Sequence, residues 1–511
     1  MSAVIGLDIG TSGARALAVD EAGAVLAGAM VEYPLLTPRP GWTEQQPDDW
    51  WQAARQVLAE VAAAVPGQVA GIGLTGQMHG AVFLDAEDRV IRPALLWNDQ
   101  RTEAQCREIT EKVGHERLLA VAGNPALTGF QAPKLLWLRD EEPDNYGRIA
   151  HVLLPKDYIR LRLCGELATD ASDASGTLLL DLRRRDWSEE ILAALELPAD
   201  WLPKVYEGPD VTGRLRQDVA AELGFPAGTP IAAGGGDNAA SAVGTGIVRV
   251  GLVASSIGTS GVVFAHTAGF RPEPSGRLHA FCHAVPGAYH LMGVTLSAGG
   301  SLRWWRDVLG GRRDYQALAE LAATAPCGSE GLVFLPYLTG ERTPHLDPFA
   351  RGAFFGLTAR HGPAHLTRAV LEGVAYSLKD SIEIMAGLGL EVEQVRATGG
   401  GARGPLWRQI QADVFGLPVH QTAVDEGPAY GAALLAGVAA GLFKDVEQAT
   451  SVIRLRPEVA EPDPARSRLY ERYHDIYRSL YPATAGAMRQ LSELASAGSD
   501  REETAPAPRP Y

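Results

Sequence analysis

One five-residue sequence occurs twice in this chain. Ile-Gly-Thr-Ser-Gly stands at residues 9–13 and again, letter for letter, at residues 257–261. In both copies an apolar, strand-like run lies on each side of the turn: Val4–Asp8, Ala14–Val19, Leu252–Ser256 and Val262–Ala265. Repetition of a motif together with its flanking pattern indicates a duplicated structural unit. The sequence therefore predicts two similar domains, each containing a strand, a tight turn and a second strand.

The rest of the chain alternates short β-like runs with helical periods. Further strand-like runs are Val69–Leu74, Ile231–Ala233, Val333–Leu335 and Val395–Ala397, and helical periods cover Pro47–Val65, Ala364–Met385 and Gly404–Phe415. Such alternation predicts an α/β fold with helices packed on sheets. A chain of 511 residues fits two large domains. We expect them at residues 1–245 and 246–485, with a flexible Pro/Ala/Glu-rich tail at 496–511.

The repeated turn has a composition suited to binding phosphate. A Gly-Thr-Ser-Gly turn presents consecutive backbone N–H groups without bulky side chains, and its hydroxyls add further donors. For a single copy, an ordinary hairpin turn is the alternative. Two copies favour a polyphosphate held by both domains. Thr11 and Ser12 of the first turn, and Gly258 and Thr259 of the second, are therefore candidate nucleotide contacts.

Asp8 directly precedes the first turn. A carboxylate beside a phosphate site is repulsive unless a cation lies between them, so Asp8 is predicted to be a Mg²⁺ ligand, directly or through water. The alternative is an aspartate that caps Gly10 or Thr11 within the turn. No lysine follows a glycine anywhere in the chain, which excludes a Walker A phosphate loop.

A third glycine-rich segment, Gly399–Gly404, follows the strand-like run Val395–Ala397. Its letters satisfy G-x-G-x-x-G, and Asp425 lies 21 residues after Gly404. This matches the dinucleotide fingerprint of an NAD-dependent oxidoreductase. The favoured interpretation is instead a nucleotide whose phosphates reach the two repeated turns. It places the adenosine part of a nucleotide against Gly400, Gly401 and Ala402.

A fourth segment, Gly234–Gly236, follows a buried strand and precedes Asp237 and Asn238. Ligands in α/β folds bind at the carboxyl ends of strands. Asp237 is the candidate general base that accepts a proton from a substrate hydroxyl, and Asn238 is expected to orient that hydroxyl. A helix N-cap is the alternative role for Asp237.

A fifth polar segment ends another strand-like run. Gln77 and His79 are candidates to bind sugar hydroxyls, with Met78 forming a wall of the pocket. Trp97 and Asp99 add an aromatic face and a hydrogen-bonding group nearby in sequence. Such a mixture is typical of carbohydrate pockets, although a polar network inside the domain is the alternative.

The charge balance limits the partners. A net charge of −15 and a pI of about 5.3 argue against nucleic acid or an anionic membrane. The first residues contain no basic segment followed by a long apolar one, and the apolar stretch Gly431–Phe443 has only 13 residues. We therefore expect a cytoplasmic protein with small-molecule partners. No motif sets the oligomeric state, and a homodimer is kept as an expectation.

These residues together resemble the FGGY family of carbohydrate kinases, and within it the xylulokinase branch. The resemblance extends over roughly residues 3–485. Beyond the glycine turns it rests on Ala132–Leu138, Gly340–His345, Gly352–Leu357 and Ala369–Glu372.

The resemblance implies two actin-like ATPase domains of the ribonuclease-H type, with ATP and a sugar in the cleft between them. It implies ATP and Mg²⁺ as cofactors and transfer of the γ-phosphate to O5 of D-xylulose. By motif match, Asp237 takes the role of base, Asp8 the metal and phosphate role, and Met78 and His79 the sugar contact. Nucleotide-contact positions match Thr11, Thr259, Gly400 and Gly401.

Other function classes stay open at this point. A kinase of the same family acting on ribulose, gluconate or glycerol shares the motifs, since discrimination depends on few side chains. An oxidoreductase would use Gly399–Gly404. A filament-forming or chaperone-type actin-like ATPase shares the phosphate turns, but it has no use for the polar groups at Gln77–His79 and Asp237-Asn238.

Overall fold

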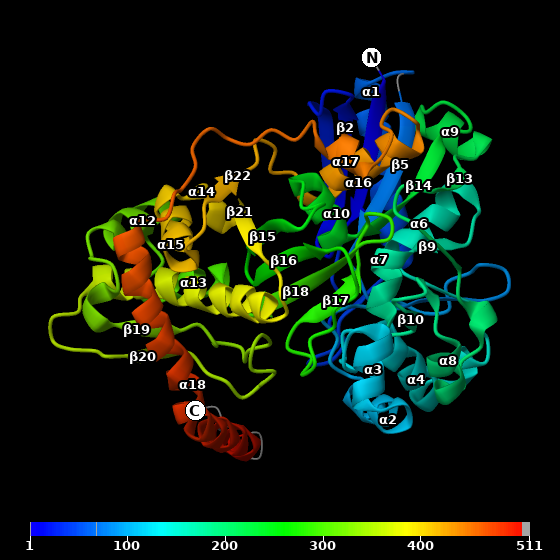
Figure 1. Ribbon diagram of the computed structural model, residues 1–511. Helices are drawn as coiled ribbons and strands as arrows, with labels where there is room; N and C mark the ends of the chain where they lie inside the picture. The colour runs from blue at the N-terminus through cyan, green and yellow to red at the C-terminus, as the bar shows by residue number, and fades with distance from the viewer. Residues whose placement is uncertain (1, 68, 503–511) are drawn as a thin grey trace, which may run out of the picture. The chain divides into compact units, whose positions relative to one another are not determined.

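The computed structural model describes residues 2–67 and 69–502 of the chain. Contacts divide the chain into two compact units (Figure 1). The first consists of Met1–Leu252, Phe264–Leu291 and Thr422–Leu455, and the second of Val253–Val263, Met292–Gln421 and Arg456–Tyr511. The first unit thus takes in two stretches beyond residue 245, and the predicted domain ranges stay predictions. The last helix, α18, extends to Glu502, and residues 503–511 of the predicted tail lie outside the described residues.

A six-stranded mixed sheet forms the centre of the first unit, in the order β13-β14-β5-β1-β2-β3. Its strands are β1 (Ala3–Ile9), β2 (Gly13–Asp20), β3 (Val25–Glu32), β5 (Val69–Gly76), β13 (Val211–Arg214) and β14 (Pro230–Gly236). β1, β5 and β14 run parallel to one another. β2 is antiparallel to both of its neighbours, β1 and β3.

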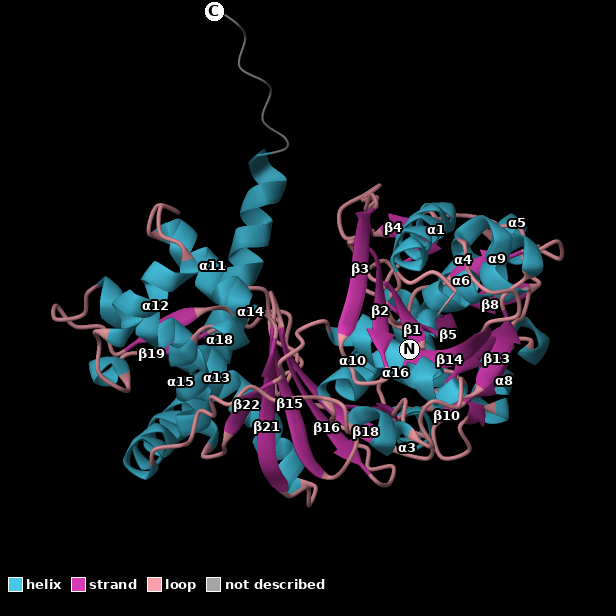
Figure 2. Cartoon of the chain, turned by 90° about the horizontal axis from the view of Figure 1, so that it is seen from above, coloured by secondary structure: helices cyan, strands magenta, loops and turns pink. Residues whose placement is uncertain are grey.

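Alternate residues of β1 face opposite sides of this sheet, as the two-residue period of a strand requires. Ile5 and Leu7 lie in one apolar cluster with helix α1 (Pro47–Ala64). Val4 lies in a second cluster with helix α16 (Gly427–Ala439). Figure 2 shows α1 and α16 on opposite faces of the sheet, so helices cover both faces.

Helix α16 lies very close to the sheet because β1 and β5 carry glycines beneath it. A Cβ atom on Gly6 would lie 1.8 Å from the carbonyl oxygen of Ala429. One on Gly73 would lie 1.9 Å from the carbonyl oxygen of Ala432. Only glycine permits such an approach of two backbones. In Figure 1 this late segment, coloured orange, lies beside the blue strands of the N-terminus.

A second six-stranded sheet repeats the strand order of the first. Its order is β17-β18-β16-β15-β21-β22, with β15 (Gly251–Ile257), β16 (Gly261–Thr267), β17 (His279–Cys282), β18 (Tyr289–Thr295), β21 (Val392–Thr398) and β22 (Val419–Gln421). The series β18-β16-β15-β21-β22 corresponds to β3-β2-β1-β5-β14, and the repeated turn joins the first two strands in each. The predicted α/β class and the internal duplication are therefore confirmed.

The remaining elements surround these sheets. The other strands are β4 (Glu44–Gln45), β6 (Val82–Leu84), β7 (Ala94–Leu95), β8 (His151–Leu153), β9 (Ala168–Asp170), β10 (Leu180–Asp181), β11 (Asp186–Trp187), β12 (Lys204–Tyr206), β19 (Val333–Leu335) and β20 (Ala353–Phe355). The other helices of the first unit are α2 (Glu103–Val113), α3 (His115–Ala122), α4 (Gln131–Glu141), α5 (Pro143–Tyr146), α6 (Pro155–Cys164), α7 (Ala171–Ala174), α8 (Glu189–Leu195), α9 (Gln217–Leu223), α10 (Asp237–Thr245) and α17 (Val446–Thr450).

The helices of the second unit are α11 (Gly299–Val308), α12 (Tyr315–Ala323), α13 (Pro363–Gly387), α14 (Gly400–Arg403), α15 (Pro405–Phe415) and α18 (Pro464–Glu502). The strands and helices predicted from the sequence are all present, with ends that differ by a few residues. Among the described residues, no helix has the length and apolar character needed to cross a membrane.

Replacement of Gly73 by alanine is expected to destabilise the first unit by about 3 kcal/mol, because the new methyl group collides with the α16 backbone. Thermal or urea denaturation measures the effect. Gly269→Ala is the matched control, since no atom lies within 4 Å of a Cβ there. Equal stability of the two variants would contradict the close packing of α16.

Candidate functional site

Three neighbouring parallel strands of the first unit end at the same level. Ile9 of β1 pairs with Gly76 of β5, and Gly76 pairs with Gly236 of β14. The next residues along each strand are therefore brought to one edge of the sheet. These are the first repeated turn, the Gln77–His79 segment and Asp237. They are distant from one another along the chain.

The first repeated turn joins β1 to β2, as predicted. The Gly10 amide donates to the carbonyl of Gly13 over 3.1 Å, and the hydroxyl of Tyr33 donates to the carbonyl of Gly10. Within the described part of the chain, the amides of Thr11 and Ser12 donate to no protein acceptor. The turn can therefore direct backbone donors at an anion.

The side chain of Gln77 is buried and forms a hydrogen bond with this turn. Its Nε2 donates to Oε1 of Gln45 over 2.9 Å, and its Oε1 accepts from the Thr11 hydroxyl over 3.2 Å. Gln45 in turn donates to the carbonyl of Thr11 over 2.7 Å. Trp97, which is 43% exposed, donates from its indole to the Thr11 hydroxyl over 2.9 Å. Gln77 and Trp97 thus hold the phosphate turn, and their predicted sugar contacts stay predictions.

Asp8 is half-buried beneath the same turn, and its Oδ1 has no hydrogen-bond partner among the residues that the structure describes. Burial and, to a smaller extent, the nearby charge of Asp237 raise the pKa of its carboxyl to about 7, against the opposing effect of Arg15. The capping alternative does not apply to Gly10, whose amide donates to Gly13 instead. A carboxylate oxygen without a partner beside a phosphate-binding turn fits a ligand for a hard cation such as Mg²⁺.

Asp237 is the first residue of α10, and Gly236 occupies the N-cap position. The N-cap alternative for Asp237 is therefore wrong by one residue. Its Oδ1 accepts from the backbone amide of Asn238 over 2.7 Å and from the side-chain amide of Asn238 over 2.9 Å. Burial raises the pKa of Asp237 to about 6. A carboxylate poised near neutral pH suits proton acceptance.

His79 is held in a left-handed backbone conformation, with φ of 68°. Its Nδ1 lies 2.7 Å from the carbonyl oxygen of Gly176. A carbonyl only accepts, so Nδ1 carries the proton, and in the neutral ring Nε2 is an acceptor. Lys134 donates from Nζ to the carbonyl of His79 over 2.9 Å, a role that the sequence motif did not reveal. Met78 beside it is buried.

Asp99 is completely buried and supports its own loop. Its Oδ2 accepts from the amide of Thr43 over 2.7 Å, and its carboxylate binds the guanidinium of Arg101. All of these partners lie within the protein. A sugar contact for Asp99 stays a prediction.

The second repeated turn joins β15 to β16 in the second unit. The Gly258 amide donates to the carbonyl of Ser260 over 2.9 Å, one residue earlier than the acceptor in the first turn, where Gly10 donates to Gly13. The carbonyls of Gly258 and Thr259 accept amide hydrogens from the start of α11. Arg303 of α11 donates to the Thr259 hydroxyl over 3.3 Å, which adds a positive charge that sequence reasoning missed.

The Gly399–Gly401 segment packs against the strand that leads to this second turn. A Cβ atom on Gly401 would lie 2.6 Å from the Cβ of Ile257, and one on Gly399 would lie 2.7 Å from the carbonyl oxygen of Ile257. The structure therefore places the predicted adenosine site beside the second repeated turn. Two helices, α14 of four residues and α15 of eleven, are separated at Gly404, instead of the single continuous helix of a dinucleotide fold.

Two further sequence motifs make contacts within the protein. Glu341 is buried, and its Oε1 accepts from the amides of Leu296 and Arg342 over 2.9 and 2.7 Å. Thr343 exchanges hydrogen bonds with Val294 at the end of β18. The 352–357 motif forms β20, which pairs with β19.

The chain matches the FGGY family of carbohydrate kinases along most of its length. The family's N-terminal domain matches residues 3–244, and its C-terminal domain matches residues 253–440. A xylulose kinase of Escherichia coli (strain K12) is 45% identical over 484 residues, which cover 93% of this chain and 98% of that enzyme.

Solved structures share the fold. A xyloylose kinase from Brucella ovis has a TM-score of 0.89 at 41% identity, covering 94% of this chain and 99% of that one. A gluconate kinase from Lactobacillus acidophilus has a TM-score of 0.92 at 27% identity, covering 96% of this chain and 99% of that one. Enzymes named for different substrates thus have this fold, so side chains must decide the substrate.

Replacement of Gln77 by leucine is expected to weaken nucleotide binding about tenfold, because Thr11 and Gln45 lose their buried partner and the turn loosens. Titration calorimetry with ATP measures this. Gln100→Leu, on an exposed side chain of the same unit, is the control. Unchanged ATP affinity with weakened sugar affinity would instead restore the sugar-contact interpretation of Gln77.

Proposed function

The chain belongs to the FGGY family of carbohydrate kinases, and from that premise we propose that it transfers the γ-phosphate of ATP to O5 of D-xylulose. The products are D-xylulose 5-phosphate and ADP. The observation that carries the proposal is the convergence of Asp8, Gln77–His79 and Asp237 at one edge of the first sheet. The xylulose kinases similar to this chain over nearly its full length support the choice of sugar.

Asp237 is proposed to accept the proton of the sugar O5 hydroxyl as that oxygen attacks the γ-phosphorus. Its raised pKa of about 6 leaves it mostly ionised at neutral pH yet basic enough to take the proton. Asn238, which donates two hydrogen bonds to Asp237, orients the carboxylate. His79 is proposed to bind a sugar hydroxyl through its ring, with Met78 lining the same pocket.

Phosphate binding is assigned to backbone amides. The amides of Thr11 and Ser12 are proposed to donate to phosphate oxygens, and the second turn is proposed to act in the same way with Arg303. Asp8 is the residue that would hold Mg²⁺, which when bound neutralises negative charge on the phosphates. Gly400, Gly401 and Ala402 are proposed to bind the adenosine part of ATP beside the second repeated turn.

The alternatives have less support. Packing against Ile257 accounts for two glycines of the Gly399–Gly404 fingerprint, so these do not require a dinucleotide. A gluconate, ribulose or glycerol kinase is the nearest competitor, because the fold admits it. A cytoplasmic location and a homodimer stay predictions.

A coupled ADP-release assay over xylulose, ribulose, gluconate, glycerol and fuculose tests the proposal. We expect the highest kcat/KM with D-xylulose and little ADP release without sugar. A higher value with another sugar would reassign the substrate within the family. Reduction of NAD in place of ADP release would overturn the kinase proposal itself.

Asp237→Asn is expected to lower kcat by about 10³-fold, because an amide cannot accept the O5 proton. Sugar binding, measured by titration calorimetry, should be largely retained since the shape of the side chain is unchanged. Steady-state kinetics of the purified variant checks the loss. Substantial remaining turnover would contradict the role of Asp237 as base.

The pH dependence of the wild-type enzyme gives a second readout of the same prediction. The base must be ionised, so kcat/KM should fall about tenfold per unit as the pH drops below about 6, near the raised pKa of Asp237. The melting temperature, measured in parallel, controls for acid unfolding. A rate independent of pH down to pH 5 would contradict the assignment.

A further inference from the structure

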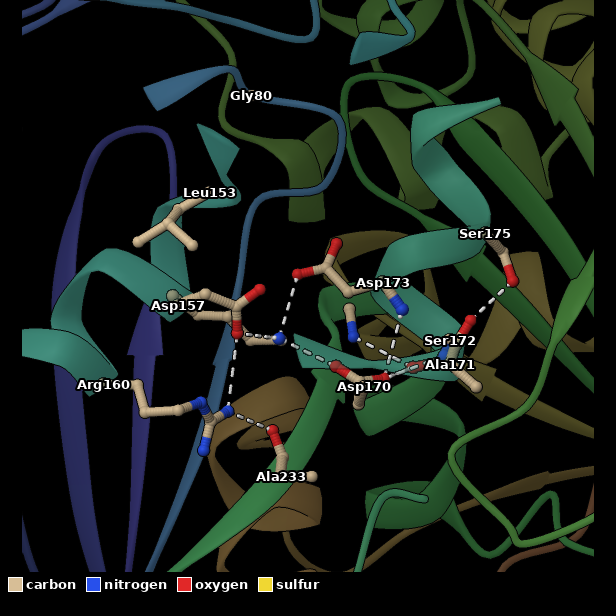
Figure 3. Close-up of polar contacts among 12 residues, drawn as sticks. Gly80, Leu153, Asp157, Arg160, Asp170, Ala171, Ser172, Asp173, Ser175 and Ala233 are labelled. Atoms are coloured by element: carbon tan, nitrogen blue, oxygen red, sulfur yellow. Dashed lines mark hydrogen bonds and ion pairs between the residues drawn. The ribbon is translucent and has the colours of Figure 1, made fainter. Parts of the chain in front are cut away.

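A cluster of five charged side chains is completely buried in the first unit. Each is at most 1% exposed: Lys156, Asp157, Arg160, Asp170 and Asp173. Figure 3 shows the three carboxylates directed toward one another from two segments of the chain, α6 and the β9–α7 connection. Burial of charges costs free energy that a hydrophobic core would avoid. We call these five residues the buried ionic cluster.

Lys156 is the centre of the cluster. Its Nζ lies 2.6 Å from Oδ1 of Asp157, 2.8 Å from Oδ2 of Asp170 and 3.4 Å from Oδ2 of Asp173. The carboxylate oxygens of Asp173 accept no hydrogen bond among the described residues, and burial raises its pKa well above the usual value. The cluster thus sets three carboxyl groups against the cations of Lys156 and Arg160.

Arg160 connects the cluster to β14. It lies one helical turn after Lys156 on α6, and its guanidinium donates to the carbonyls of Ala232 over 2.9 Å and Ala233 over 2.6 Å. The pairing of β14 with β5 shifts register between Ala232 and Gly235. Bulges of this kind re-aim the residues that follow, and here the next residue after the strand is Asp237.

Asp170 connects the cluster to the start of α10. Its Oδ1 accepts from the amide and the hydroxyl of Ser172, over 2.9 and 2.5 Å. The Ser172 Oγ in turn accepts from the amide of Gly236 over 3.2 Å. Gly236 immediately precedes Asp237, so the contacts run from Lys156 to the backbone of the proposed base.

The same segment also contacts the proposed sugar-binding residue. Asp170 begins a continuous stretch, residues 170–177, made of the end of β9, α7 and a short 3₁₀ turn. The carbonyl of Gly176 in that turn accepts from Nδ1 of His79 over 2.7 Å. One end of the stretch is thus fixed by Lys156, and the other fixes the ring of His79.

We propose that the buried ionic cluster is a positioning device. Through Arg160 it holds β14, and through Asp170 and Ser172 it holds the 170–177 stretch, so that Asp237 and His79 keep their places around the sugar. Asp170 and Ser172 are therefore positioning residues and not catalytic ones. The inference rests on the proposed function, because the reaction assigns Asp237 and His79 their roles.

Asp170→Asn and Asp200→Asn form a matched pair for the test, since Asp200 is an exposed aspartate of the same unit that lies outside the cluster. Asp170→Asn keeps the shape but weakens the ion pair with Lys156, and we expect kcat/KM for D-xylulose to fall about 10- to 100-fold through both kcat and the sugar KM. The KM for ATP should stay within about twofold. Asp200→Asn makes the same chemical change at an exposed site and should keep kcat/KM within about threefold of wild type.

Melting temperatures establish that each variant is folded before its kinetics are compared. A folded Asp170→Asn variant with unchanged kcat and sugar KM would overturn the inference, and so would equal losses in both aspartate variants. Ser172→Ala is the second arm in case Asp170→Asn fails to fold. It should lower kcat for D-xylulose at least fivefold, and an unchanged kcat in this variant would also overturn the inference.

Failure of the proposed function has a different signature. A wild-type enzyme that phosphorylates none of the panel sugars contradicts that function and, with it, this inference. An active wild-type enzyme whose folded Asp170 and Ser172 variants behave normally contradicts the inference alone.

Discussion

The close approach of α16 to the first sheet fixes the geometry on which the proposed chemistry depends. The helix touches β1 and β5 at Gly6 and Gly73, where no side chain fits between the backbones. It also touches α10, where a Cβ on Gly431 would lie 1.8 Å from the carbonyl oxygen of Ala240. The same helix therefore fixes the positions of β1, which carries Asp8, and of α10, which begins with Asp237. Shifting α16 would move both carboxylates.

Bringing two carboxylates together has an electrostatic cost that the fold sustains. Asp8 and Asp237 are both half-buried, and each has a pKa above the usual range because of burial. Such a site favours a cation and a proton-donating substrate, both of which relieve the unfavourable charge. The buried ionic cluster is connected to the same site through Ser172. It contains a further carboxyl of raised pKa, Asp173. Rigid support of this kind is what a positioned base requires.

The sequence predicted features that repeat or alternate along the chain. The duplicated turn and the strand runs predicted both sheets, because the two-residue period and the glycine turns are local signals. Contacts between distant residues were not predictable. Gln77 was expected to face a sugar, yet its partners are Gln45 and Thr11, and nothing in the sequence pairs them. Nor does the sequence reveal that α16, Gly427–Ala439, packs on the sheet formed by the N-terminal strands.

The duplication also clarifies why only one unit is expected to hold the cation. The residue before Ile9 is Asp8, whereas the residue before Ile257 is Ser256. A carboxylate in both positions would add repulsion toward a polyphosphate without a second cation to offset it. After the fourth strand of the shared order the units differ again. The first unit continues with Gln77-Met78-His79, and the second continues with Gly399-Gly400-Gly401. One topology thus presents side chains in one copy and bare backbone in the other. This suits the proposal of a reacting sugar at the first and, at the second, the adenosine part of a nucleotide, which needs close approach but takes no part in the reaction.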